Sequence, residues 1–101
     1  MRVLCWNVRG LGVKSKQSMI RKTTSRNKVE MVFLQETKKE EILELEVGRL
    51  WYDDNFCFVT APSSGKSGGL ITIWDVSKFK LHQSIGNPRY ILISGFWVED
   101  N

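Results

Sequence analysis

The first 29 residues of this sequence contain no acidic side chain, and the first acid along the chain is Glu30. The same stretch carries eight basic residues: Arg2, Arg9, Lys14, Lys16, Arg21, Lys22, Arg26 and Lys28. Such one-sided charge favours a polyanionic partner such as nucleic acid. A solvated helix face, on which lysines serve solubility, is the alternative that the sequence leaves open.

Long apolar runs are also absent. No stretch approaches the roughly 20 residues that cross a membrane, and residues 1–13 lack the apolar core of a secretion signal. No Asn-x-Ser/Thr sequence marks a glycosylated, secreted protein. These absences predict a nuclear or cytoplasmic protein that is not secreted and has no membrane partner.

Cysteine and histidine are scarce. Cys5 and Cys57 have no framework spacing and lie in apolar, strand-like stretches, so we expect buried free thiols, with a single disulfide as the less favoured alternative. His82, the one histidine, has no carboxylate or serine nearby in sequence and is a poor candidate for a catalytic base. No Cys/His spacing indicates zinc, and no Gly-x-Ser-x-Gly element indicates a serine hydrolase.

What the sequence does contain is the pattern of one α/β domain over residues 1–101, without repeats, low-complexity tracts or linkers. Strands are predicted at residues 2–8, 31–36, 56–60, 70–74, 78–84 and 90–98. Helices are predicted at residues 15–27, capped by Ser15, and from 38 to between 47 and 50, with Thr37 and Glu40 as a capping box. The second helix is expected to turn four apolar side chains inward: Ile42, Leu43, Leu45 and Val47.

The order of these elements predicts the topology. A strand, a helix and a strand within some 35 residues form a right-handed crossover between parallel strands, and the first strand is expected to be covered on both faces. The later strands are spaced as hairpins and should be antiparallel. The fold class is therefore α/β, with a parallel βαβ start followed by antiparallel strands.

Two polar residues stand at the ends of the first two strands. Glu36 follows an apolar run, and Asn7 ends the first strand. Because parallel strands end at the same edge of a sheet, an amide and a carboxylate should meet there. Hard cations such as Mg²⁺ take oxygen ligands, and an Asn/Glu pair beside a basic surface suits metal-assisted phosphodiester chemistry. Alternatively, Glu36 is simply the first solvated residue after a strand.

The stretch Ser-Gly-Lys-Ser at residues 64–67 invites a nucleotide-binding interpretation, which fails. A phosphate-binding loop needs a glycine five positions before Gly65, where Thr60 stands, and a helix afterwards, where a strand is predicted. The glycines of this loop better suit a tight turn or a close approach of backbone.

Three motifs occur in this order: Leu-Cys-Trp-Asn-Val-Arg-Gly-Leu-Gly at residues 4–12, Val-Phe-Leu-Gln-Glu-Thr-Lys at 32–38, and Ser-Gly-Gly-Leu at 67–70 leading to Ile-Trp-Asp at 73–75. Together they resemble the opening of the endonuclease/exonuclease/phosphatase superfamily. The closest resemblance is to the apurinic-type endonuclease domain at the N-terminus of LINE-type (non-LTR) retrotransposon polyproteins, particularly those of plants. The resemblance runs the whole length of the chain but covers only the first part of that domain.

The resemblance implies the N-terminal half of a four-layer α/β sandwich, in which two sheets pack together and helices cover them. It implies a catalytic role for Asn7, metal binding by Glu36 with Asn7, and hydrolysis of DNA with Mg²⁺ or Mn²⁺. Arg9 departs from the pattern, because some members carry an acid there. The later elements of the family do not occur in residues 1–101. They are an Asp/Asn pair, a further Asp and a Ser-Asp-His ending.

The sequence therefore predicts a fragment of a metal-dependent DNA endonuclease of retrotransposon type that is inactive alone. DNA contacts are expected from Arg9, Lys14, Lys16, Arg21 and Lys22. The expected protein partner is a complementary C-terminal fragment or a second copy, bound through an exposed apolar sheet face with Val3, Leu4, Phe33, Ile71, Ile73 and Ile91. A nucleic-acid-binding remnant without chemistry and a truncated gene product without function are the alternatives.

Overall fold

A computed structural model describes residues 1–65 and 67–98 of the chain. Its centre is a four-stranded sheet in the order β1-β2-β4-β3. These strands are β1 (Val3–Asn7), β2 (Met31–Gln35), β3 (Phe56–Ala61) and β4 (Leu70–Asp75). Two further strands, β5 (Phe79–Asn87) and β6 (Tyr90–Trp97), form a separate hairpin. The helices are α1 (Lys14–Arg26) and α2 (Glu44–Gly48).

The connections follow the predicted fold class. β1 and β2 are parallel neighbours joined through α1, and β4 pairs antiparallel with both β2 and β3. The α/β class, with a parallel βαβ start followed by antiparallel strands, is confirmed. α1 begins one residue before Ser15, so Val13 is its N-cap and the predicted serine cap is wrong. No helix within the described ranges is long and apolar enough to cross a membrane.

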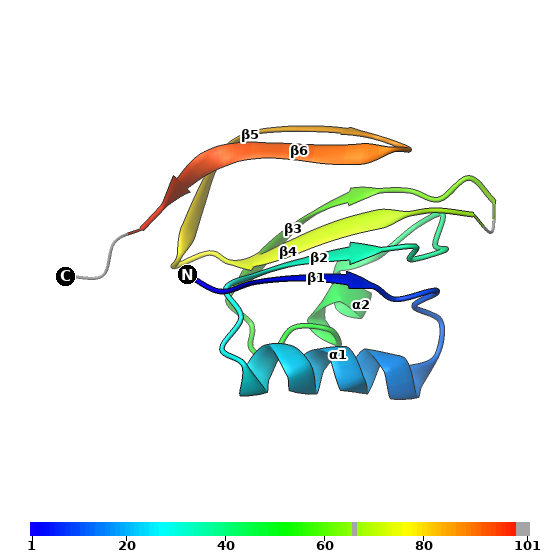
Figure 1. Ribbon diagram of the computed structural model, residues 1–101, viewed down its shortest axis with the longest axis horizontal. Coiled ribbons are helices and arrows are strands. Elements are labelled where there is room, and N and C mark those ends of the chain that lie inside the picture. The colour runs from blue at the N-terminus through cyan, green and yellow to red at the C-terminus, as the bar shows by residue number, and fades with distance from the viewer. Residues whose placement is uncertain (66, 99–101) are drawn as a thin grey trace.

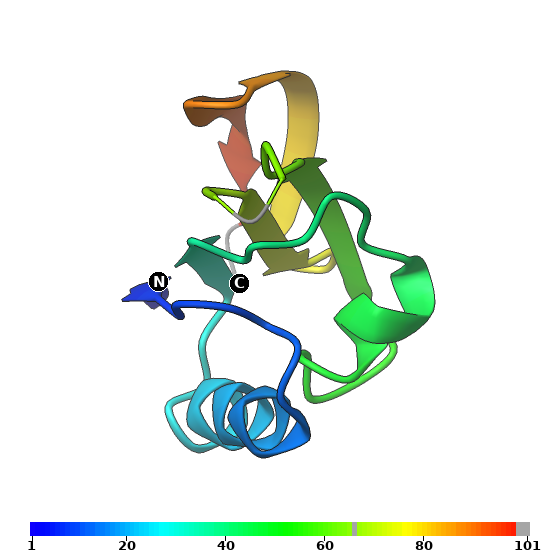
Figure 2. The ribbon, with the colours of Figure 1, turned by 90° about the vertical axis from the view of Figure 1, so that its right-hand side faces the viewer.

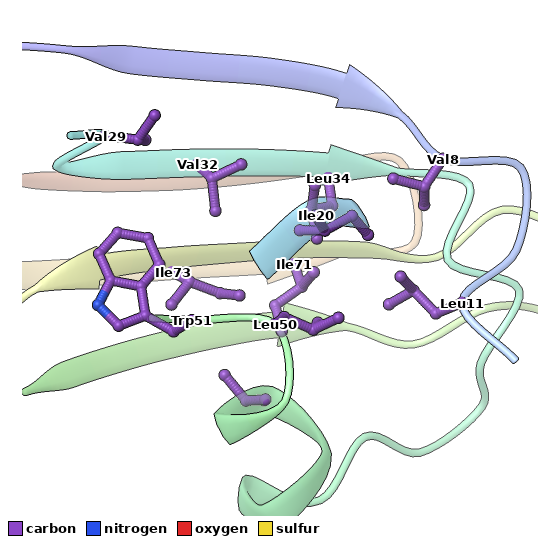
Figure 3. Packing of buried hydrophobic residues seen from close by; sticks show 11 residues of the cluster. Val8, Leu11, Ile20, Val29, Val32, Leu34, Leu50, Trp51, Ile71 and Ile73 are labelled. Atoms are coloured by element: carbon purple, nitrogen blue, oxygen red, sulfur yellow. The ribbon is translucent and has the colours of Figure 1, made fainter. Parts of the chain in front are cut away.

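The main core lies between the four-stranded sheet and α1. Alternate residues of a strand point to one face, and Val32, Leu34, Ile71 and Ile73 line this face of β2 and β4. Ile20 of α1 packs against them, and Leu50 and Trp51 cover the same core after α2 (Figure 3). All these side chains are at most 2% exposed, which makes this layer the rigid support of the strand ends.

The hairpin β5–β6 lies across the opposite face of the sheet, so that the sheet is sandwiched between α1 and the hairpin (Figures 1 and 2). Phe79, the first residue of β5, packs the start of the hairpin against the sheet. Its ring meets Trp74 edge-on at a centroid distance of 5.8 Å and Trp97 at 5.2 Å. Edge-to-face aromatic pairs of this kind add about 0.5–1.5 kcal/mol beyond the area they bury. Met31 completes this smaller core.

β1 is exposed on one face, contrary to prediction, because only its face toward the main core is covered. Its burial alternates: Leu4 and Trp6 are half-buried, whereas Val3, Cys5 and Asn7 are exposed. The two cysteines are free, as predicted, but both are exposed and not buried. Cys5 and Cys57 lie on β1 and β3, the two edge strands on opposite sides of the sheet.

The predicted helix starting at residue 38 is wrong for its first six residues. Instead of turning into a helix, this segment pairs with the loop before β4: Ser63 N–H donates to the Lys39 carbonyl at 2.9 Å. The Thr37–Glu40 capping box therefore does not form, and Leu43 and Leu45 are 55% and 73% exposed instead of inward. At the start of α2 the Glu46 carboxylate accepts from Leu43 N–H at 3.4 Å.

The apolar surface also differs from the expected one. Ile71 and Ile73, expected on an open face, are 1% and 0% exposed, because α1 and its flanking loops cover them. Val3 is 45% exposed, as expected. The hairpin carries further exposed apolar side chains: Leu81, Ile85, Tyr90, Leu92 and Phe96.

Candidate active-site edge

Asn7 and Glu36 come together at the edge where β1 and β2 end. Asn7 is opposite Gln35 in the parallel register, and Glu36 is the next residue. Pairing continues beyond the strands, because Val8 N–H donates to the Gln35 carbonyl at 2.9 Å and Gly10 N–H to the Glu36 carbonyl at 2.7 Å. The two loops thus leave the sheet side by side, as the parallel crossover predicts. We refer to this place as the Asn7/Glu36 edge.

The backbone at this edge is strained. Arg9, Glu36 and Lys38 have φ of 51°, 55° and 56°, three of the four left-handed non-glycine residues in the described part of the chain. Each such residue costs roughly 1–2 kcal/mol relative to a right-handed conformation. Strain of this kind collects at functional sites, where the surrounding structure enforces it. The left-handed conformation of Glu36 also ends the alternation of side chains between the two faces of the sheet, and the Glu36 side chain is half-buried.

The strain is enforced by a glycine pair that lies against the loop. The N–H groups of Thr37 and Lys38 donate to the carbonyls of Gly69 and Gly68, at 3.1 and 2.8 Å. A Cβ on Gly69 would collide with Thr37 Oγ1 and lie 3.2 Å from Lys38 N, and its φ is +95°. This close approach confirms the role expected for these glycines. Thr37 is 1% exposed, and its hydroxyl has no partner among the described residues.

The side-chain oxygens at the edge are available to a ligand. Asn7 is exposed, and its Oδ1 accepts only a long bond of 3.3 Å from Arg9 N–H. Glu36 is half-buried, and within residues 1–65 and 67–98 its carboxylate makes neither a hydrogen bond nor an ion pair. A carboxylate without a partner at a strained strand end is a free anionic ligand.

A divalent cation fits these residues only as part of a larger shell. One carboxylate and one amide oxygen are donors that Mg²⁺ accepts, with water and phosphate oxygens in the other positions. No group of three or more His, Cys, Asp or Glu side chains in the described ranges could enclose a metal. The donor set thus suits a hard cation that keeps most of its water, and does not suit zinc.

The five predicted DNA contacts divide into two groups. Lys16 and Arg21 have structural bonds: the Lys16 ammonium donates to the Val8 carbonyl at 2.6 Å, and Arg21 donates to the Gly48 carbonyl at 2.8 Å. Arg9, Lys14 and Lys22 are exposed. Lys16 holds the loop after β1 against α1, a role that charge counting does not reveal.

Other residues considered from sequence lie apart from the edge. His82 is exposed on β5, at a bulge where the pairing with β6 skips it. Asp75 is buried and structural: its Oδ1 accepts from Asn55 Nδ2 at 3.0 Å and from Ser77 Oγ at 2.7 Å. Lys66, part of the rejected phosphate-loop element, lies outside the described residues.

No protein-family model and no curated protein matches the chain. Solved structures do match. The AP endonuclease LMAP from Leishmania major is 28% identical over 72% of this chain, with a TM-score of 0.57. An AP endonuclease from Archaeoglobus fulgidus and the APE2 catalytic domain from Xenopus laevis each cover 84% of the chain. Their identities are 18% and 17% and their TM-scores 0.62 and 0.59.

The chain thus has a fold similar to that of AP endonucleases. It spans only a small part of them: 23% of the Leishmania protein, 26% of the Xenopus domain and 30% of the Archaeoglobus protein.

Proposed function

We propose that residues 1–101 are the N-terminal part of one incomplete endonuclease/exonuclease/phosphatase-type domain. Its complete form would be of the LINE retrotransposon type and would hydrolyse DNA phosphodiester bonds with Mg²⁺ or Mn²⁺. The observation that carries this proposal is the unpartnered Glu36 carboxylate, held on strained backbone beside Asn7 at the ends of parallel strands. The similarity of fold to AP endonucleases supports it.

Each residue has a distinct part in this proposal. Glu36 binds the divalent cation, and the exposed Asn7 amide orients a phosphate oxygen or a further ligand. When bound, the cation supplies charge stabilisation at the phosphate oxygens. The glycine pair Gly68-Gly69 keeps the Glu36 loop in place through its two backbone hydrogen bonds. Arg9, next to Asn7 and exposed, is placed to contact the DNA backbone.

The partners follow from the surface. DNA is the proposed nucleic-acid partner, and Arg9, Lys14 and Lys22 are proposed to bind it. Arg21 would contribute the guanidinium N–H groups that do not bond to the Gly48 carbonyl. Lys16 is left out of this set because its ammonium bonds to the Val8 carbonyl. The proposed protein partner is a complementary C-terminal fragment or a second copy, which would cover exposed apolar side chains. Val3 and the outer residues Leu92 and Phe96 of β6, exposed by 45%, 56% and 64%, are the candidates.

Isothermal titration with Mg²⁺ and Mn²⁺ tests the metal assignment. We expect weak binding by the wild-type chain and at least about a tenfold loss of affinity in Glu36→Gln, because the substitution removes the charged member of the proposed Asn7/Glu36 pair and keeps the shape of the side chain. Glu40→Gln is the matched control, since Glu40 is an exposed carboxylate four residues along the same loop. Circular dichroism confirms that both variants fold.

Two outcomes would contradict the assignment. Equal affinity in wild type and Glu36→Gln would place the cation elsewhere. Equal loss in Glu36→Gln and Glu40→Gln would show that the chain attracts cations through its general acidic charge and has no specific ligand at this edge.

A further inference from the structure

The outer face of α1 is a continuous basic strip with two shallow grooves. One groove, of about 360 Å³, is lined by Lys14, Gln17, Ser18, Arg21 and Arg49. The other, of about 330 Å³, is lined by Ser18, Arg21, Lys22, Ser25, Arg26 and Tyr52. Ser18 and Arg21 belong to both, so the two grooves join end to end. We call these residues the α1 strip.

The strip arises from the helical repeat. Ile20 and Thr24 are buried under the sheet, and positions on the other side of the helix face outward. Lys14, Ser18, Arg21 and Ser25 recur at intervals of four and three residues, so they form one row along the axis. Small serines therefore alternate with long cations. Ser18 and Ser25 line the grooves together with these cations.

The cations of the strip are not neutralised by acids. The ion pairs within the described ranges involve the N-terminal ammonium and Lys39, and none involves the strip. Glu46 interacts electrostatically with Arg49, but its carboxylate is paired with Lys39 at 3.0 Å. The hydrogen bond from Lys39 is the main cause that lowers the pKa of Glu46. Lys14, Lys22 and Arg26 are exposed. The strip therefore presents net positive charge to solvent.

Tyr52 adds a neutral aromatic wall. Its hydroxyl donates to the Val29 carbonyl at 3.2 Å, and burial, together with the nearby Asp75 and Asp53 carboxylates, raises the pKa of its phenol. The ring therefore stays uncharged and stacks on Trp51, at a centroid distance of 4.9 Å. Tyr52 therefore contributes a ring and no negative charge to the groove.

The strip begins near the Asn7/Glu36 edge and leads away from it. The N-terminal end of α1 lies at the same end of the molecule as the arrowheads of β1 and β2 (Figure 1). Lys16 fastens this end of the helix to the carbonyl of Val8, the residue after Asn7. A helix of 13 residues is about 20 Å long, so the strip can follow several successive phosphates of one strand.

We propose that the α1 strip binds the phosphate backbone of nucleic acid, on a surface separate from the metal-binding edge. Arg and Lys side chains contact phosphate oxygens, and serine hydroxyls donate to them. A membrane surface is less well matched, because an interfacial helix turns an apolar face outward, whereas Ile20 of α1 points into the core. This proposal rests on the DNA partner named under the proposed function and extends its contacts from Lys14, Arg21 and Lys22 to the whole strip. It does not depend on metal binding by Glu36, so failure of the Mg²⁺ titration would leave it standing.

The test measures binding of a labelled duplex DNA by fluorescence anisotropy, in EDTA and between about 50 and 200 mM salt. The variant pair Lys22→Gln with Arg26→Gln removes two cations of one groove that make no hydrogen bond or ion pair among the described residues, and glutamine keeps the helix propensity. We expect affinity to fall about tenfold or more, and the slope of log affinity against log salt to decrease by about 2.

The control pair Lys80→Gln with Arg89→Gln removes the same charge from the hairpin and should change affinity less than about threefold, since only screened, long-range attraction is lost. Equal losses in both pairs would overturn the proposal, because binding would then depend on net charge alone. Absence of DNA binding by the wild type would overturn it too. So would binding to vesicles with anionic lipids, weakened by the Lys22/Arg26 pair, when DNA does not bind.

Discussion

At the scale of single residues, the strain at Glu36 needs an explanation. A glycine or asparagine would adopt a φ of 55° at lower cost. Glutamate occupies this position although it costs roughly 1–2 kcal/mol and its side chain has no partner among the described residues. The fold therefore gains nothing from the carboxylate itself. The strained backbone and the free carboxylate together agree with the metal-binding role proposed for Glu36.

Gly69→Ala should destabilise the chain by about 2–5 kcal/mol, the sum of about 1–2 kcal/mol of left-handed strain for alanine and about 1–3 kcal/mol of overpacking against Thr37. The Cβ added at residue 69 would collide with Thr37 Oγ1, and the carbonyl of this residue accepts a hydrogen bond from Thr37 N–H. Urea unfolding measures the change. Gly68→Ala is the matched control, because its φ is +75° but no atom lies within 4 Å of the added carbon. We expect a loss of only about 1 kcal/mol there, and equal losses would refute the close approach.

At the scale of elements, periodicity predicted more than local signals did. The apolar runs of β2 and β4 located the central strands within about one residue of the observed ends. The predicted helix after residue 38 rested on a local capping pattern. In the structure, the N–H groups of Thr37 and Lys38 instead donate to carbonyls of a loop some 30 residues further along the chain. A tertiary contact of this kind overrides a cap worth about 1 kcal/mol.

The candidate site was predictable in part. Parallel strands end at one edge, so the meeting of Asn7 and Glu36 followed from the βαβ pattern alone. The left-handed conformation of Arg9, Glu36 and Lys38 could not be predicted, because none of these residue types favours it. The adjacent glycines of the Ser-Gly-Gly-Leu motif were a signal of close backbone approach, but the sequence does not say which loop they approach.

The C-terminus of α1 offers a test of helix termination. Val29 N–H donates to the Thr24 carbonyl at 2.9 Å and Lys28 N–H to the Ser25 carbonyl at 3.2 Å, the two bonds of a Schellman motif. Lys28, at the position that glycine usually occupies, has φ of 50°. Lys28→Gly should raise the free energy of unfolding by about 0.5–1 kcal/mol, since relief of strain exceeds the added entropy of the unfolded chain.

Thermal or urea unfolding measures this gain, and Lys28→Ala is the control. Alanine removes the same charge but keeps the Cβ, so it should leave stability within about 0.5 kcal/mol of wild type. A gain of the same size in both variants would mean that the lysine charge, and not the backbone conformation, is responsible.

At the scale of the whole molecule, the two faces of the central sheet are covered unequally. The face toward α1 is closed by a cluster of residues that are at most 4% exposed. The hairpin face is closed mainly around Phe79, while Cys5 on β1 and the outer side chains of the hairpin remain in solvent. The rigid layer thus supports the Asn7/Glu36 edge from one side only. The hairpin side is where a partner could add contacts.

The isolated chain should not cleave DNA at an enzymatic rate. Hydrolysis needs an activated water and stabilisation of the developing charge, worth about 10²–10⁴-fold and 10²–10³-fold respectively. In the described part of the chain, no group of three or more His, Cys, Asp or Glu side chains could hold a metal ion, and the one histidine, His82, is exposed on the hairpin. The α1 strip and Glu36 can hold DNA and a cation, but neither offers a base to the attacking water.

Incubation of the chain with supercoiled plasmid and Mg²⁺ measures this, with Glu36→Gln as the control for contaminating nucleases. We expect no nicking above the level of the variant, even at protein concentrations that saturate DNA binding. Metal-dependent nicking by the wild type that disappears in Glu36→Gln would show that residues 1–101 contain a complete catalytic site. The missing base would then have to lie within this chain, and substitution of His82 by Gln would be the first experiment to find it.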